Sequence, residues 1–296
     1  MKKIAPSELI INTDGSIFHL HLKPDQIARD IILVGDPGRV EMIADFFEGI
    51  EFKVQNREFV TITGRYKGKR MTVLSTGIGT DNIDIVINEL DALVNIDLGT
   101  REIKTKLTSL NLIRIGTSGA LQGDIPVDAF LVSRKAIGFD GLMNFYARRE
   151  DFADLPFEDA FKSYTNWNPL LASPYVVNCD LDLYNKITDD EFISGITISA
   201  PGFYGPQGRE LRLNIVDQHI NDKIELFRFN ELKITNYEME CSAIYGLSKL
   251  LGHKALTVCI IIANRINRNA SIDYKPVMKR LVKKILNKLT HIENNG

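Results

Sequence analysis

Short runs of large apolar residues alternate along the chain with segments in which apolar residues recur every three or four positions. The runs are typical of buried strands, and the recurring spacing is typical of helices with one buried face. The pattern predicts strands at residues 31–34, 59–64, 71–75, 112–115, 129–133, 193–198, 234–237 and 256–263. It predicts helices at residues 37–47, 83–94, 174–184, 238–251 and 277–289. This alternation, without repeats or a linker, predicts one α/β domain over residues 1–296.

Several segments depart from the regular pattern. Residues 1–16 form a polar lead-in, and residues 17–22 alternate so that an extended segment would place both of its histidines on one side. Residues 145–167 are aromatic and acidic without a clear period, which predicts surface loops, and we expect a surface insertion over residues 147–173. Residues 200–209 are predicted to form an irregular loop after a strand.

The composition serves mainly to exclude classes of partner. The chain has 44% hydrophobic and 25% charged residues and a net charge of −2, which predicts neither a nucleic-acid nor a membrane partner. Cys179, Cys241 and Cys259 lack metal-ligand spacing, which indicates free thiols in a reducing compartment. We expect a cytoplasmic protein, because no signal-peptide core follows Met1 and the longest apolar run, residues 255–263, is too short to cross a bilayer.

One arginine lies where a buried strand is predicted to end. Large apolar residues flank Arg114, and we expect residues 116–119 to form the turn that leaves the strand. A buried guanidinium without a partner is very costly. The partner is either a core carboxylate or a bound anion, which the hydroxyls of Thr117 and Ser118 and bare backbone N–H groups would also hold. This stretch alone favours neither alternative.

Two other predicted strand ends carry glycines. At residues 35–39 a strand meets a helix with Arg39 in its first turn, and open N–H groups beside a guanidinium suit a phosphate. Residues 75–79 contain G-x-G, but Asn82 stands where a dinucleotide fingerprint needs its third glycine, so we exclude a Rossmann cofactor site. Because ligands of open α/β sheets bind at the carboxyl ends of strands, these turns favour an anion site.

The order of the motifs resembles the nucleoside phosphorylases of the uridine phosphorylase type. Each motif is ordinary by itself, and the specificity lies in their order, which spans most of the chain. The resemblance rests on Phe18-His19-Leu20, Gly35-Asp36-Pro37-Gly38-Arg39, Arg57-Glu58-Phe59, Ser75-Thr76-Gly77-Ile78-Gly79, Arg114 to Gly119, Phe203 to Arg209, Asn236-Tyr237-Glu238-Met239-Glu240 and Asn264-Arg265. It implies the single-domain fold of that family, with a central mixed β-sheet flanked by helices.

The resemblance also implies a site with three parts. The implied phosphate-binding residues are Gly35, Arg39, Arg114 and Thr117, with Arg57 from a neighbouring subunit. The implied ribose-binding residues are Glu238, Met239 and Glu240, with His19 from that neighbour, and the implied base-binding residues are Phe203, Gln207 and Arg209. The implied catalytic residues are Arg114, Arg209, Glu240 and His19. These roles suit the side chains, because arginine holds phosphate in a bidentate manner and a carboxylate accepts from two vicinal hydroxyls.

The implied reaction is phosphorolysis of uridine to uracil and ribose 1-phosphate, with phosphate as co-substrate and no metal or organic cofactor. The implied partners are a nucleoside and phosphate, and the implied assembly is a homo-oligomer, at least a dimer, with shared sites. The family's monovalent-cation site, for an ion such as K+, would match Glu58, Ile78 and Asn82, where a serine is usual at the last position. The base loop also departs from the family, with Gly205-Pro206 in place of Pro-Gly and Gly208 in place of an acidic residue.

Three alternatives stay open. A nucleosidase of the same fold uses water in place of phosphate and would not need three arginines at one anion. A purine nucleoside phosphorylase of this fold protonates the base with an aspartate after the last core strand, where this chain has Asn264-Arg265. A non-catalytic nucleoside-binding protein would bind uridine without turnover.

Overall fold

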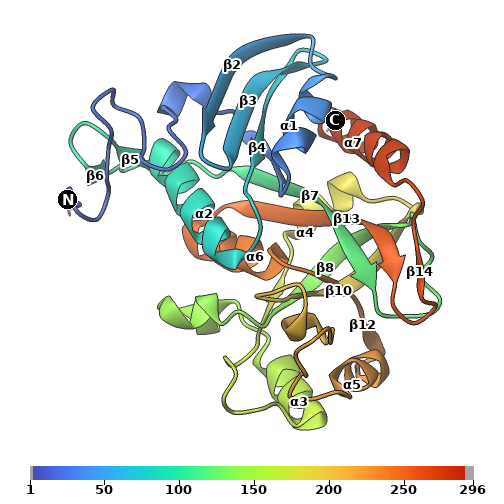
Figure 1. The fold of residues 1–296 in the computed structure, drawn as a ribbon. Coiled ribbons are helices and arrows are strands. Elements are labelled where there is room, and N and C mark those ends of the chain that lie inside the picture. The colour runs from blue at the N-terminus through green and yellow to red at the C-terminus, as the bar shows by residue number, and fades with distance from the viewer. Residues whose placement is uncertain (1–2, 291–296) are drawn as a thin grey trace, which may run out of the picture.

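The computed structural model describes residues 3–290, which form a long mixed sheet with helices on both faces (Figure 1). The strands are β1 (Asp30–Val34), β2 (Gly49–Asn56), β3 (Phe59–Tyr66), β4 (Lys69–Ser75), β5 (Ile96–Asp97), β6 (Glu102–Ile103), β7 (Asn111–Ala120), β8 (Phe130–Gly138), β9 (Tyr175–Asn178), β10 (Phe192–Ser199), β11 (Arg228–Phe229), β12 (Leu232–Glu238), β13 (Lys254–Asn264) and β14 (Asn269–Ala270). The α-helices are α1 (Pro37–Ala44), α2 (Thr80–Asn95), α3 (Leu155–Thr165), α4 (Leu181–Ile187), α5 (Ile220–Leu226), α6 (Cys241–Leu251) and α7 (Lys275–Thr290).

Four parallel strands form the centre of the sheet. β4, β1, β7 and β13 are neighbours in that order, so their carboxyl ends lie along one edge. Ile31, Leu112 and Leu256 on these strands have no exposed surface, which explains why the strands read as continuous apolar runs. The predicted α/β fold with a central mixed sheet is confirmed.

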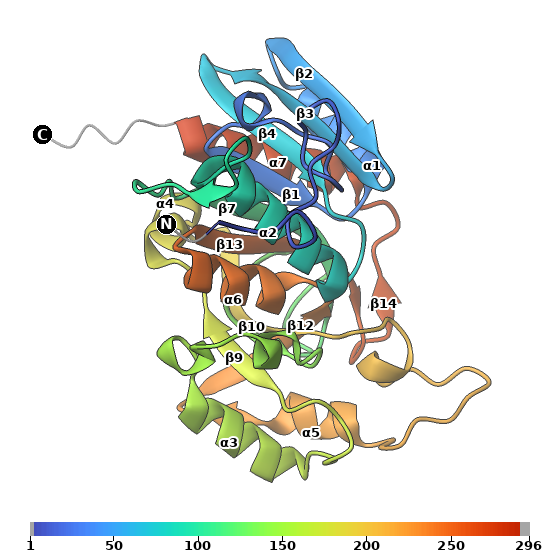
Figure 2. The same ribbon diagram turned by 90° about the vertical axis from the view of Figure 1, so that its left-hand side faces the viewer.

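Helices cover both faces of this centre. α2 and α6 lie side by side on the face nearest the viewer in Figure 2. α7 contacts α1 and α4 behind the sheet in the same view, and α3 and α5 contact each other at the lower end. α6 ends at Leu251, as the predicted helix at 238–251 does, and its cap Gly252 has a left-handed φ of 79° that suits glycine.

Five strands close into a ring at the lower half of the molecule. β13 pairs with β7 and β8, β8 pairs with β10, and β10 pairs with β12. β12 then returns to β7, where Asn236 pairs with Ala120 and Tyr237 with Gly119. This closure brings the carboxyl end of β12 beside the last residues of β7, with the carboxyl end of β10 next to β12.

The prediction that residues 116–119 form a turn is wrong. β7 continues without interruption from Asn111 to Ala120, because Gly116 to Ala120 pair with β13 and the last two residues also pair with β12. The glycines suggested a turn, but β13 pairs with residues 116–120 and β12 with the last two, and this tertiary pairing overrides the local preference.

Two other predictions between residues 145 and 184 are wrong. Residues 155–165 form α3, whose Asp154 accepts a hydrogen bond from the Phe157 N–H and whose Phe157 and Phe161 are fully buried. The predicted helix at 174–184 is instead the strand β9 followed by α4, because residues 175–178 pair with β8. Pairing with a distant strand decides β9, whereas a local cap and a buried apolar face define α3.

The histidine segment at residues 17–22 is a turn and not an extended segment. The Ile17 N–H donates to the Leu22 carbonyl, and the His21 N–H donates to the Ile17 carbonyl. His21 has a φ of 55°, so its side chain and that of His19 find different partners. The prediction that both histidines lie on one side is therefore wrong.

The three cysteines are free and buried. Within residues 3–290, no helix has both the length and the apolar character that crossing a bilayer requires.

The Asp154 cap gives a test of α3. Asp154→Ala removes the acceptor of the Phe157 N–H and the ion partner of Lys135, so we expect the free energy of unfolding to fall by about 1–2 kcal/mol. Asp159→Ala, which removes an exposed carboxylate paired with Lys162, is the control and should change it by less than about 0.5 kcal/mol. Urea denaturation measures the free energy of unfolding of both variants. Equal losses would contradict the role of Asp154 as the cap of α3.

Candidate active site

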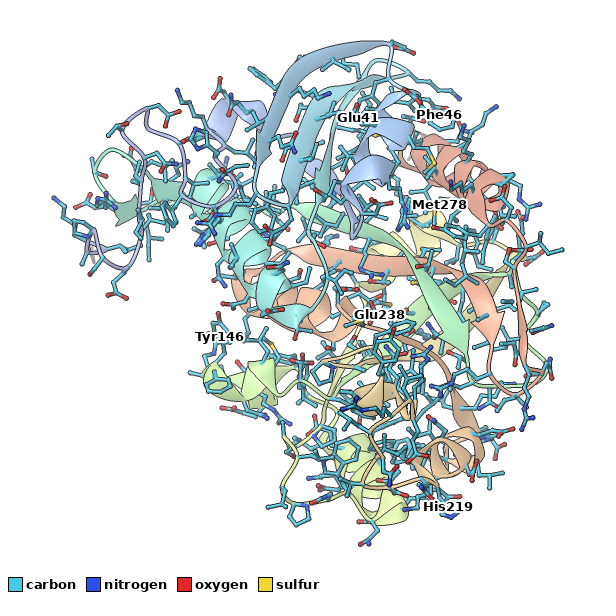
Figure 3. The ribbon with its side chains drawn as sticks, viewed as in Figure 1. Glu41, Phe46, Tyr146, His219, Glu238 and Met278 are labelled. Carbon is cyan, nitrogen blue, oxygen red and sulfur yellow. The ribbon has the colours of Figure 1, made fainter. Side chains whose placement is uncertain are left out.

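A buried arginine between two carboxylates lies near the centre of the molecule, where Figure 3 labels Glu238. Nη2 of Arg114 donates to Oε2 of Glu240, and Nη1 lies 3.3 Å from Oε2 of Glu238. The other oxygen of Glu240 accepts from the Gly79 N–H at 2.8 Å. Burial alone would lower the pKa of Arg114, but Glu240 and then Glu238 more than offset it, so the pKa is raised and the guanidinium stays charged.

A second buried guanidinium approaches the first without a carboxylate of its own. Arg39 in α1 donates to the Ile115 carbonyl at 3.1 Å, and no carboxylate of the described residues forms an ion pair with it. Burial lowers the pKa of Arg39, and the charge of Arg114 lowers it further. Nε of Arg114 is also buried without a hydrogen-bond partner. Two close cations with a spare donor create a local demand for an anion.

Glycine turns border this pair of arginines. A Cβ on Gly35 would lie 3.4 Å from the Gly77 carbonyl, so the turns after β1 and β4 lie against each other. Gly116 leaves the space that the Arg114 guanidinium fills, because a Cβ there would come within 2.0 Å of Nη1. Thr117 is half-buried on the same strand, and the Ser118 hydroxyl is buried without a partner. The structure therefore places four of the predicted phosphate residues on neighbouring elements: Gly35 and Arg39 follow the end of β1, and Arg114 and Thr117 lie within the adjacent strand β7.

The predicted ribose residues lie at the start of α6. Glu240 stands just before the helix, Met239 is half-buried, and Glu238 ends β12. Burial raises the pKa of Glu238, although Arg114 opposes this shift.

The predicted base residues meet in one loop. Nη1 of Arg209 donates to Oε1 of Gln207 at 2.6 Å, and its guanidinium carbon lies 4.0 Å from the centre of the Phe203 ring. Within the predicted loop at 200–209, residues 205–207 form a 3₁₀ turn and Gly208 has a φ of 68°. The turn itself, rather than alternation along a strand, brings Gln207 and Arg209 together.

Arg265 holds the base loop in place, a role that the sequence did not predict, since the residue appeared there only as part of the Asn264-Arg265 motif. It donates to the carbonyls of Gln207 and Gly208, and it lies over the ring of Tyr237. Burial lowers the pKa of Arg209, and the charge of Arg265 adds to this. The one sequence feature that pointed to Arg265 was its position directly after β13. Its hydrogen bonds could not be predicted, because Gly208 and Gln207 lie 57 and 58 residues away in the sequence.

His19 and Arg57 lie together and outside the buried cluster. Nδ1 of His19 contacts Oε1 of Glu89 at 2.7 Å, and the Asn56 side chain donates to the His19 carbonyl. Arg57 is exposed at the turn between β2 and β3, 6.0 Å from the Phe18 ring. No hydrogen bond or ion pair within residues 3–290 joins either side chain to Arg114 or Glu240.

The candidate cation residues surround Gly77. A Cβ on Gly77 would lie 2.4 Å from Nδ2 of Asn82 and 3.1 Å from Cγ of Glu58. Glu58 and Ile78 are exposed. The amide oxygen of Asn82 and the carboxylate of Glu58 are ligands of the type that hard cations bind.

A cavity of about 1320 Å³ adjoins the base loop. Its walls come from residues 165–172 and 204–217, with Arg209 among the lining side chains and Leu170, Leu211 and Val216 at the exposed rim. Concave, mostly apolar sites of this kind with a few polar groups suit small-molecule ligands.

A family model described as the phosphorylase superfamily matches residues 29–292. The chain belongs to the phosphorylase superfamily. A uridine phosphorylase of Haemophilus influenzae is 31% identical over 85% of this chain and 87% of the relative. A DeoD-type purine nucleoside phosphorylase of Listeria monocytogenes is 27% identical over 82% of this chain and 85% of the relative. A solved nucleoside phosphorylase of Trypanosoma brucei that shows uridine phosphorylase activity is 30% identical, with a TM-score of 0.84 over 95% of this chain and 99% of its own.

This membership confirms the resemblance on which the sequence-based prediction rested. The family match covers every candidate residue of this phosphorylase except His19, which precedes it.

Gly116 tests how tightly the arginine is packed. In Gly116→Ala the new Cβ meets Nη1 of Arg114 and lies 3.0 Å from Sγ of Cys259, so we expect the free energy of unfolding to fall by about 1–3 kcal/mol. Gly119→Ala is the control, because its Cβ would meet nothing closer than the Ala263 carbonyl at 3.9 Å, and the change should stay below about 1 kcal/mol. Equal free energies of unfolding for the two variants in urea would show that the Arg114 side chain can move aside to make room for the new Cβ.

Proposed function

We propose that this phosphorylase cleaves uridine with inorganic phosphate to give uracil and ribose 1-phosphate. The observation that carries the proposal is the approach of two buried guanidinium groups, Arg39 and Arg114, one of which has no carboxylate partner. A bound phosphate would satisfy the charge of Arg39, which no carboxylate of the described residues pairs with, and the free Nε of Arg114. Because its cysteines are free, we place the reaction in the cytoplasm.

The site suits a displacement at the sugar. The C1′–N1 bond of uridine breaks and an oxygen of HPO4²⁻ bonds to C1′. The negative charge that develops on uracil faces Arg209, and the proton given up by the phosphate ends on the released uracil. Glu240 would accept hydrogen bonds from the vicinal ribose hydroxyls, since its carboxylate already lies beside Arg114. The protein then contributes position and charge, and none of these steps requires a nucleophilic side chain.

Particular contacts favour this function over its rivals. A hydrolase uses water and a neutral nucleoside, so it has no anionic substrate for the neighbouring guanidinium groups of Arg39 and Arg114 to bind. A purine-specific enzyme of this fold would place an acid where Asn264 donates to the Gln122 and Ile125 carbonyls and Arg265 holds the base loop. A protein that only binds nucleosides would need no buried arginines beside the sugar site.

The deciding experiment is base release from uridine, inosine and cytidine, with and without phosphate. We expect uridine cleavage that depends on phosphate. Equal rates without phosphate would mean a nucleosidase, preference for inosine would mean a purine enzyme, and uridine binding without turnover would mean a binding protein.

Arg209→Ala tests base recognition. Removing the guanidinium leaves Gln207 and the uracil edge unpaired, so kcat/KM for uridine should fall about 100-fold or more, while phosphate affinity stays nearly unchanged. Arg212→Ala is the control, because Arg212 is exposed and lines the same cavity, and it should change kcat/KM less than about threefold. An Arg209→Ala enzyme that keeps the uridine rate would rule out this assignment.

We further propose a homo-oligomer in which His19 and Arg57 complete the site of the neighbouring subunit. The support is the exposure of Arg57, the partial exposure of His19 and the separation of both from the Arg114 cluster.

Mixed oligomers test this shared site. Arg57→Ala and Arg209→Ala should each be nearly inactive, but a hybrid dimer holds one site with both arginines intact. Co-expression in equal amounts should therefore restore about a quarter of wild-type activity. Sedimentation checks that hybrids form. A fully active monomer, or hybrids without restored activity, would contradict the proposal.

A further inference from the structure

Ser199, the last residue of β10, connects two elements at the buried cluster. It has no exposed surface. Its hydroxyl donates to Oε1 of Glu238 at 2.5 Å and accepts from the Ser242 N–H at 2.8 Å. The hydroxyl is thus fixed by the first turn of α6, and its proton is directed at a carboxylate.

Glu238 is held by three donors besides Arg114. These are the Ser199 hydroxyl and the backbone N–H groups of Glu240 and Cys241, each of the latter at 3.0 Å. Carboxylates with this many donors keep a fixed orientation.

The two ion pairs of Arg114 differ in kind. The contact with Glu240 is a short hydrogen bond, whereas Glu238 lies 3.3 Å from Nη1 in an ion pair that is longer than the usual charge-assisted bond. Glu238 therefore neutralises part of the charge of Arg114 without drawing the guanidinium into a close pair.

We propose that Ser199 is a positioning residue for phosphate: its hydroxyl holds Glu238 back, so that the Arg114 guanidinium stays directed at the anion site. The inference rests on the proposed phosphate role of Arg114. Without the Ser199 donor, Oε1 of Glu238 keeps only the Cys241 N–H, so the carboxylate can turn on the backbone donors that remain and form a close pair with Nη1. A close pair draws the guanidinium toward Glu238 and so turns its unpartnered Nε away from the anion site.

Ser199→Ala tests the proposal, with Thr197→Val as the control. Thr197 lies two residues earlier on the same strand and is equally buried, but its hydroxyl bonds to Ser133 and Asn236 and not to Glu238. Calorimetry measures the Kd of inorganic phosphate, kinetics measure KM and kcat, and urea denaturation measures stability.

We expect Ser199→Ala to raise the Kd and KM of phosphate about tenfold, with a much smaller change in kcat, whereas Thr197→Val loses stability but keeps phosphate affinity. The effect should vanish in a Glu238→Gln background, because a carboxamide cannot form the competing ion pair. Should Ser199→Ala fail to fold, Ser199→Cys, which keeps the size and a weak donor, should raise the phosphate Kd by an intermediate factor.

Unchanged phosphate affinity in the folded Ser199 variant, or an equal loss in Thr197→Val, would overturn the inference. An equal loss for Ser199→Ala in the Glu238→Gln background would also overturn it. A wild-type protein that binds phosphate but does not cleave uridine would refute the proposed function alone, because the calorimetric comparison still decides the role of Ser199. A wild type that does not bind phosphate would refute both.

Discussion

The structure depends on how it satisfies one buried positive charge. Arg114 lies inside β7, where an unpaired guanidinium is very costly, and Glu238 and Glu240 supply the compensating charge. This requirement fixes several other features. β12 must end beside β7 to deliver Glu238, α6 must begin where Glu240 meets the Gly79 N–H, and residue 116 must have no side chain.

The closed ring of strands meets this requirement and also builds the ligand site. Return of β12 to β7 places the start of α6, the end of β10 and the base loop around the carboxyl ends of β1 and β4. Arg265, directly after β13, ties the base loop to the same ring through the carbonyls of Gln207 and Gly208. The residues proposed to bind phosphate, sugar and base thus share one frame, which would limit the loss of orientation during the proposed reaction.

The sequence predicted well what local pattern controls. Continuous apolar runs located β1, β7 and β13, and helical spacing located α2, α6 and α7. It failed where distant strands decide: β7 continues through its glycines because β13 and β12 pair with it, and β9 forms because β8 does. The two alternatives for Arg114 could not be separated from the sequence, because carboxylates 124 and 126 residues away pair with it while its Nε stays without a partner. The roles of the predicted site residues stay predictions.

The most direct test of the central claim is the phosphate dependence of Arg114→Lys. Lysine keeps a positive charge between Glu238 and Glu240, so the fold should survive, but it lacks the planar fork that reaches both the carboxylates and an anion. We predict cooperative unfolding like that of the wild type and a loss of about 100-fold or more in kcat/KM for phosphate. A variant that is as stable as the wild type and uses phosphate equally well would show that Arg114 is only a structural ion partner.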